Sequence, residues 1–120
     1  MSDSLRKIVP CDENFYTWGE SAVGWKLLEH ESLQIRQERM SPDTSEIAHL
    51  HQKIDQYFYV LAGQLAIECA NNEVLLGPQE GAFVPANCLH RAYNAGPIDV
   101  DFLVISNGQT AFDRIEVNYD

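Results

Sequence analysis

The chain has 120 residues, a length that fits one domain. Hydrophobic residues make up 45% of it, which is enough to form a core. Eighteen acidic residues against eight basic ones give a net charge of −10 at pH 7. Such a charge repels phosphate backbones and anionic lipid surfaces. We therefore expect neither nucleic acid nor a membrane as a partner.

The first residues lack the apolar core of a signal peptide, and no apolar run approaches the roughly 18 residues of a membrane span. These features predict a cytoplasmic protein. The three cysteines, Cys11, Cys69 and Cys88, are an odd number and lie far apart along the chain. A disulfide framework needs an even count, and a zinc ribbon needs closely spaced pairs, so we expect reduced thiols.

The first 14 residues are polar and favour a loosely docked N-terminal arm. The segment that follows, 15–28, holds both tryptophans with Gly19 and Gly24 between them. Glycines at that spacing argue against a long helix. The segment is therefore predicted to form a turn or hairpin that leads into a sheet.

From residue 33 onward the pattern is that of an all-β protein. Short stretches rich in alternating or β-branched residues recur every eight to twelve residues, with glycine, proline and asparagine between them. The predicted strands are 33–40, 47–51, 56–61, 65–69, 74–76, 82–84, 89–94 and 100–105. This spacing is typical of a sandwich or barrel, and no segment has the 3.6-residue period of a long helix.

His49 and His51 are the most informative pair in the chain. One residue separates them in an extended stretch, so both imidazoles point to the same face and can share one metal ion. Gln56 begins the next predicted strand with an amide oxygen that can act as a weaker, uncharged ligand, and His90 follows a turn. Surface or packed histidines also produce such pairs, so the pattern alone leaves both interpretations open.

Two segments of the chain resemble the two motifs of the cupin family. HLHQKIDQYFYVLAG, residues 49–63, resembles the first motif, G-x5-H-x-H-x(3,4)-E-x6-G. PANCLHRAYN, residues 85–94, resembles the second motif, G-x5-P-x-G-x2-H-x3-N. The resemblance covers roughly residues 33–106 of a single domain, 1–120. It implies a double-stranded β-helix, or jelly-roll, barrel.

The chain departs from these motifs at four positions. Asp43, Gln79 and Asn87 stand where the motifs have glycine. Asp and Asn tolerate left-handed backbone better than most residues, so we expect the turns to survive. The more serious departure is Gln56, which stands where the first motif has glutamate and brings no negative charge to a metal.

The resemblance implies a metal site formed by His49, His51, Gln56 and His90. Loss of the carboxylate should weaken binding of hard ions and leave an imidazole-dominated site. We expect zinc or nickel after purification, with iron, copper and manganese as further candidates. The alternative is an empty barrel whose histidines are a relic or bind the substrate.

Strand parity predicts the rest of the pocket. If Gln56 points inward, Phe58 and Val60 do too, and an inward His90 brings Cys88 and Ala92 with it. These four neighbours of the ligands are the predicted substrate-binding residues, and they would give the pocket apolar walls.

The same parity turns Tyr57 and Tyr59 outward, where they need cover from the N-terminal segment or from a second subunit. Because cupins commonly dimerise through such a face, the resemblance implies a homodimer. Arg36 and Arg39 lie on opposite faces of one strand, so at most one of them can meet a ligand inside.

A small-molecule ligand in the barrel is the function that the resemblance implies, with three forms left open. The first is a metal-dependent enzyme such as an isomerase or a dioxygenase. The second is a metal-free sugar isomerase or epimerase in which His49 or His51 is the acid or base. The third is a non-catalytic module that binds a small metabolite. No catalytic residue is assigned.

Overall fold

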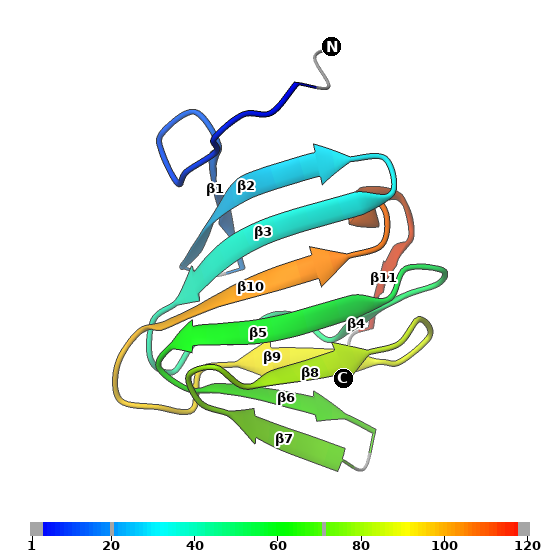
Figure 1. Ribbon diagram of the computed structural model, residues 1–120. Coiled ribbons are helices and arrows are strands. Elements are labelled where there is room, and N and C mark those ends of the chain that lie inside the picture. Colours follow the sequence, from blue (N-terminus) through cyan, green and yellow to red (C-terminus); the bar gives the residue numbers. More distant parts are fainter. Residues whose placement is uncertain (1–3, 20, 71, 118–120) are drawn as a thin grey trace.

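The computed structural model describes residues 4–19, 21–70 and 72–117. In these residues the chain forms strands and one short 3-10 helix (Figure 1). The elements are β1 (Phe15–Trp18), β2 (Ala22–His30), β3 (Leu33–Met40), β4 (His49–His51), β5 (Gln56–Ala62), β6 (Leu65–Cys69), β7 (Asn72–Leu76), β8 (Gly81–Val84), β9 (His90–Tyr93), β10 (Val100–Ser106), η1 (Thr110–Phe112) and β11 (Arg114–Glu116). The all-β prediction is confirmed.

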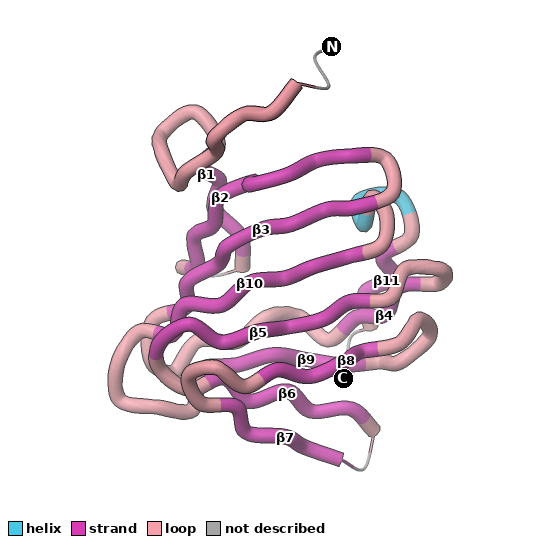
Figure 2. Tube along the Cα trace, viewed as in Figure 1, coloured by secondary structure: helices cyan, strands magenta, loops and turns pink. Residues whose placement is uncertain are grey.

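The strands form two sheets that face each other (Figure 2). The larger has the order β1-β2-β3-β10-β5-β8 and the smaller the order β11-β4-β9-β6-β7. Neighbouring strands in both sheets run antiparallel. This is the arrangement of a double-stranded β-helix, as the sequence predicts.

The core lies between the two sheets and is built by strand alternation. In β10, buried and partly exposed residues alternate along the whole strand, and Val100, Phe102 and Val104 point inward. Phe102 stacks on Phe58 of the neighbouring strand, with ring centroids 6.1 Å apart. Burial of each such phenylalanine contributes about 1.5–3 kcal/mol of transfer free energy. This packing fixes the direction in which the polar residues of the same strands point.

The predicted N-terminal hairpin is β1 and β2, with Gly19 in its turn at φ 59°. It extends the larger sheet at the edge of β3, on the side away from β5. Trp18 packs edge-on against Phe102 inside the sandwich, with centroids 6.5 Å apart. The hairpin therefore does not cover the outer face of β5, where Tyr57 remains 41% exposed.

Three turns keep the left-handed backbone that glycine provides in the family motifs. Asp43, Gln79 and Asn87 have φ angles of 65°, 66° and 65°. Gly63, the glycine that the chain retains, has φ 84°, and a Cβ there would lie 2.4 Å from the carbonyl oxygen of Asp99. The expectation that the turns survive the substitutions is confirmed.

The C-terminal segment contributes structure that the sequence pattern did not predict. After η1 the chain forms β11, which pairs with β4 so that Arg114 lies opposite His51. This pairing brings Asp113 and Arg114 to the strand that carries two of the predicted ligands. The domain therefore uses residues beyond 106 to complete its smaller sheet.

The expectation of three reduced thiols is wrong for two of them. Cys69 and Cys88 form a disulfide with a Cα–Cα distance of 6.6 Å, while Cys11 is free and exposed. The two residues are 19 apart in sequence, but β6 pairs with β9 so that Cys69 lies opposite His90. Sheet register, which spacing along the chain does not reveal, brings them together. No helix in the described part of the chain is long and apolar enough to cross a membrane.

Candidate metal centre

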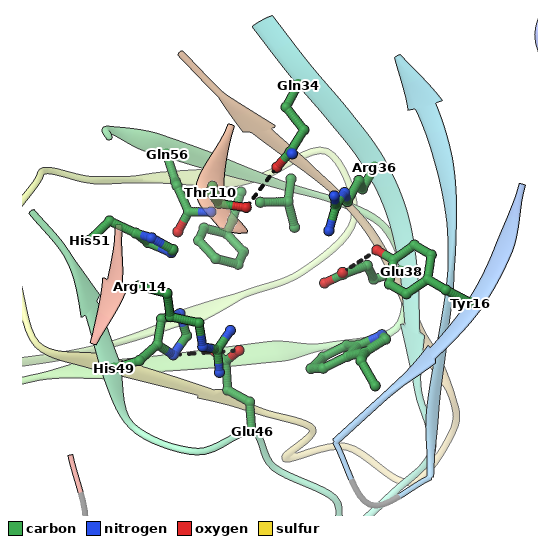
Figure 3. Close-up of a pocket in the computed structure, with 13 residues that line it drawn as sticks. Tyr16, Gln34, Arg36, Glu38, Glu46, His49, His51, Gln56, Thr110 and Arg114 are labelled. Carbon is green, nitrogen blue, oxygen red and sulfur yellow. Dashed lines mark hydrogen bonds and ion pairs between the residues drawn. The ribbon is translucent and has the colours of Figure 1, made fainter. Parts of the chain in front are cut away.

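A cavity of about 120 Å³ opens between the two sheets (Figure 3). Polar and ionisable side chains from both sheets line most of it. The lining residues are Tyr16, Trp18, Gln34, Arg36, Glu38, Glu46, His49, His51, Gln56, Phe58, Val104, Thr110 and Arg114.

The three motif histidines lie close together, and two of them, His49 and His51, line the cavity. His49 and His51 lie on β4, and His90, the first residue of β9, pairs in register with His49. All three are buried, with 2–4% of their surface exposed. The ring of His49 has its centroid 4.5 Å from that of His90 and 5.2 Å from that of His51. His51 and His90 are further apart, at 6.4 Å.

Each imidazole is held through its Nδ1 atom. The Nδ1 of His49 lies 2.8 Å from the carbonyl oxygen of Ile47, and that of His90 lies 2.9 Å from the carbonyl oxygen of Cys88. A carbonyl can only accept, so in both rings Nδ1 carries the proton and Nε2 keeps its lone pair. His51 has the equivalent contact with Asp113, at 2.8 Å. This is the arrangement by which proteins orient histidine ligands toward a metal.

Within the part of the chain that the structure describes, two buried polar atoms at the site have no hydrogen-bond partner. They are Nε2 of His90 and Oε1 of Gln56. The amide nitrogen of Gln56 donates to Oγ of Ser106 at 3.1 Å, which fixes the amide and leaves its oxygen as a free acceptor. Unsatisfied buried acceptors are rare in native proteins. A cation bound between these two residues would accept a lone pair from each of the two atoms. The residues present therefore fit a divalent metal.

Burial keeps the histidines neutral. It lowers the pKa of His49 to about 3, with Arg114 contributing, and it also lowers the pKa values of His51 and His90. Desolvation disfavours the charged imidazolium in each case. At pH 7 all three rings are in the form that binds metals.

Glu46 is a site residue that the sequence reasoning missed. Its carboxylate is 9% exposed, and Oε2 accepts the backbone N–H of Ala92 at 3.0 Å. Within the described residues, Glu46, His49 and His90 offer ligand atoms that all lie within 4.8 Å of one another. Burial is the main cause that raises the pKa of Glu46 to about 8. Glu46 falls in the variable positions ahead of the H-x-H pair, so no motif position identifies it.

The opposite side of the cavity carries a second polar group. Tyr16 donates a hydrogen bond to Oε2 of Glu38, and Figure 3 shows this pair across the cavity from the histidines. Burial is the main cause that raises the pKa of Glu38 to about 7. Arg36 lies over the ring of Tyr16, 5.3 Å from its centroid, and forms an ion pair with Glu29 at 2.9 Å.

Of the four predicted substrate-binding residues, only Phe58 lines this cavity. Val60 and Ala92 are buried in the hydrophobic core. Cys88 lines a separate, mostly apolar cavity of about 290 Å³ because it lies in the turn before β9, where strand alternation no longer applies. The three residues therefore do not share the space in front of the histidines.

The alternation of side chains along β3 determines which of the two arginines, Arg36 or Arg39, faces the cavity. Arg36 lines the cavity together with Gln34 and Glu38, which share its face. Arg39 lies on the other face, where it pairs with Asp101 at 2.6 Å and covers the ring of Trp25. One arginine of the pair thus faces the cavity.

Residues 36–106 match the family model described as a cupin domain. The chain belongs to the cupin family. None of the curated proteins matches it significantly. The cupin fold is shared with many solved structures at low sequence identity.

Three of these structures illustrate the different kinds of protein that share the fold. A Klebsiella pneumoniae protein with a double-stranded β-helix domain has 16% identity and a TM-score of 0.77 over 96% of this chain and 100% of its own. The polyketide cyclase RemF from Streptomyces resistomycificus has 19% identity and a TM-score of 0.73, covering 87% and 76%. A sugar phosphate isomerase from Silicibacter pomeroyi has 20% identity and a TM-score of 0.72, covering 82% and 67%. At these identities the likeness establishes the fold alone.

Proposed function

We propose that this cupin binds one divalent transition metal ion through His49, His51, Gln56 and His90. The observation that carries the proposal is the pair of buried, unpartnered acceptors, Nε2 of His90 and Oε1 of Gln56, beside neutral imidazoles. Zinc or nickel suits a ligand set dominated by imidazole, and iron, copper or manganese remain candidates.

We further propose that the protein catalyses proton transfer on a small carbonyl or enol compound. When bound, the metal supplies Lewis-acid polarisation of the substrate oxygen. Glu38 faces the histidines and has a pKa near the pH of the cell, which suits a group that takes a proton and returns it. Tyr16 holds Oε2 of this carboxylate, and no donor to Oε1 is found among the described residues.

The proton shift balances without a further reactant. Glu38 removes a proton from the carbon next to the carbonyl, the electron pair moves to the carbonyl oxygen, and the proton returns to a different carbon or to the oxygen. Arg36 and Arg114 place positive charge at the cavity wall and favour a substrate with negative charge. The cyclase and isomerase names of the structural relatives are consistent with chemistry on such oxygenated molecules.

The test combines metal analysis with an exchange assay. Purified protein and the variants His90→Ala and His30→Ala are analysed for metal, because His30 lies on β2 away from the cavity. Incorporation of deuterium from D2O into a panel of small 2-oxo acids, ketones and sugars is followed by proton NMR. We expect about one metal ion per chain in the wild type and His30→Ala, little in His90→Ala, and exchange only with metal bound. Metal binding without exchange of any compound would support the non-catalytic binding module instead.

We also propose a homodimer that covers the outer face of β5 and β8. Tyr57, Leu61 and Phe83 are large and exposed there, by 41%, 42% and 63%. The N-terminal hairpin lies at the other edge of the same sheet, so a second subunit is the remaining candidate cover. Light scattering should give twice the mass of one chain, and Phe83→Lys should give a monomer. A monomeric wild type at micromolar concentration would refute the dimer.

A further inference from the structure

The ligand set proposed above lacks a negative charge. Gln56 supplies a neutral oxygen, and the three imidazoles are neutral because burial lowers their pKa values. A dication that enters this part of the cavity loses much of its hydration, and an anionic ligand would offset that cost. Among the described residues, Glu46 is the acidic residue whose carboxylate groups with two of the histidines, His49 and His90.

We propose that Glu46 is the carboxylate ligand of the metal and supplies the charge that Gln56 lacks. The inference rests on the metal site of the proposed function. Ligand atoms of Glu46, His49 and His90 lie within 4.8 Å of one another, in a group that does not include His51. His90, whose Nε2 has no hydrogen-bond partner among the described residues, belongs to this same group.

The backbone of β9 holds Glu46 in place. Oε2 accepts the N–H of Ala92, which is two residues from His90, and the backbone N–H of Glu46 donates to the carbonyl oxygen of Ala92 at 3.0 Å. These two bonds tie Glu46 to the strand that carries one histidine, while its own chain leads directly into β4, which carries the other two. With Oε2 engaged, Oε1 is the oxygen available to a metal.

A purely positioning role for Glu46 fits the contacts less well. The Nδ1 of His49 already donates to the carbonyl oxygen of Ile47 at 2.8 Å, whereas Oε1 of Glu46 lies 3.9 Å from that nitrogen, beyond hydrogen-bond distance. The orientation of His49 is thus set without Glu46. Without a cation beside it, burial favours the neutral, protonated form of this carboxyl group, so a bound metal ion is what would hold it charged.

Arg114 does not fill the role of that cation. It acts on Glu46 from β11, but its own guanidinium pairs with Glu116 at 3.2 Å and its side chain is 36% exposed. Glu38 adds a second negative group that raises the pKa of Glu46. The metal is therefore the partner that best accounts for a carboxylate at this position.

The experiment measures metal affinity, with no substrate involved. Mn²⁺ and Zn²⁺ titrations of the metal-free full chain are followed by calorimetry for the wild type, Glu46→Gln, Glu46→Gln/Gln56→Glu and the exposed control Glu31→Gln. Glu46→Gln keeps an oxygen that can accept the Ala92 N–H and removes only the charge. We expect it to bind Mn²⁺ at least tenfold more weakly, with a smaller loss for Zn²⁺, because hard ions gain most from anionic oxygen.

The double variant moves the charge to the position that the family motif uses, so we expect it to recover at least half of the lost logarithmic affinity. The visible absorption spectrum of bound Co²⁺ should change in Glu46→Gln. It should also change in Glu46→Asp, which keeps the charge on a shorter side chain. With two variants, the test does not fail if one of them folds poorly. Mn²⁺ affinity within twofold of the wild type and an unchanged Co²⁺ spectrum in Glu46→Gln would overturn this inference alone. A wild type that binds none of the three ions would overturn the proposed function as well.

Discussion

Nδ1 of His51 lies 2.8 Å from Oδ1 of Asp113, a residue 62 positions further along the chain. The other oxygen of the same carboxylate accepts the backbone N–H groups of Lys53 and Ile54, both at 3.0 Å. Asp113 therefore holds the ring of one predicted ligand and the turn that follows it. The C-terminal segment thereby becomes part of the candidate metal centre.

Replacement of Asp113 by asparagine should weaken metal binding. The amide offers one acceptor oxygen where the carboxylate offers two, so either His51 or the backbone of the turn loses its partner. Loss of such an outer contact typically costs 10–100-fold in metal affinity. A zinc titration of Asp113→Asn beside Glu31→Gln, which removes one exposed charge, measures the effect. Equal affinities in the two variants would show that Asp113 does not orient the ligand.

Gln56→Glu restores the family motif and should tighten metal binding. The new carboxylate takes the place of the unpartnered Oε1, within reach of the Ser106 hydroxyl. A tenfold gain in Mn²⁺ affinity needs only about 1.4 kcal/mol, a modest amount for a charge that meets a partly desolvated dication. Without metal the same carboxylate is buried and uncompensated, so the melting temperature should fall.

Thermal unfolding with and without Mn²⁺ checks this prediction, with Gln64→Glu as an exposed control on the same chain. The expected pattern is a metal-free mutant less stable than the wild type that gains more stability from Mn²⁺ than the wild type does. A destabilised mutant whose melting temperature does not change when Mn²⁺ is added would count against the ligand role of Gln56.

Glu38 should make the stability of the metal-free protein depend on pH. Burial raises its pKa from the ordinary 4.5 to about 7, so between these values the folded state binds more protons than the unfolded state. Its contribution to stability is therefore complete below about pH 4.5 and is lost as the pH rises through 7. At about 1.4 kcal/mol per pKa unit the loss is about 3.5 kcal/mol at most.

The comparison of wild type with Glu38→Gln isolates this effect from the histidines, whose lowered pKa values act in the opposite direction. The groups that face Glu38 are Tyr16 on β1, Arg36 on β3, Arg114 on β11 and Glu46 ahead of β4, and all remain in the variant. The free energy of unfolding is measured in urea at pH 5, 6, 7 and 8. We expect that of Glu38→Gln to increase relative to that of the wild type as the pH rises. Parallel profiles would mean that Glu38 keeps an ordinary pKa.

Reduction of the Cys69–Cys88 disulfide should destabilise the protein. Cross-linking two residues 19 apart restricts the unfolded chain and is worth about 3 kcal/mol. Because the carbonyl oxygen of Cys88 accepts from Nδ1 of His90, reduction should also weaken metal binding. Dithiothreitol should lower the melting temperature of the wild type and of Cys11→Ser but not that of Cys69→Ser/Cys88→Ser. Three reactive thiols in the native, unreduced protein would contradict the disulfide.

The fold was largely predictable from the sequence. Residue composition indicates the strands, and the positions of the turns follow from the residue types and from the family motifs. β5 shows its alternation directly in the sequence, and Asp43 and Asn87 are residue types that accept the left-handed backbone their turns require. Gln79 adopts the same conformation without that preference, and only the motif alignment marks its position. At Asp43 and Asn87 the residue type and the motif position therefore predict the same turn conformation.

The candidate site was predictable only in part, because half of it comes from long-range register. His49 and His90 lie in recognisable motifs. Glu46 and Arg114 reach the cavity, and Asp113 reaches His51, through the pairings of β4 with β9 and β11. The disulfide depends on register in the same way. No spacing along the chain records which strand lies next to which.

The most direct measurement of the central claim is the metal content of the purified protein by mass spectrometry, before and after incubation with Zn²⁺ and removal of the excess. We predict about one ion per chain in the wild type and in His30→Ala, and less than a fifth of that in the double variant His49→Ala/His90→Ala. A folded wild type that retains no metal after incubation would contradict the account, because the unpartnered atoms of His90 and Gln56 would then have no cation to bind.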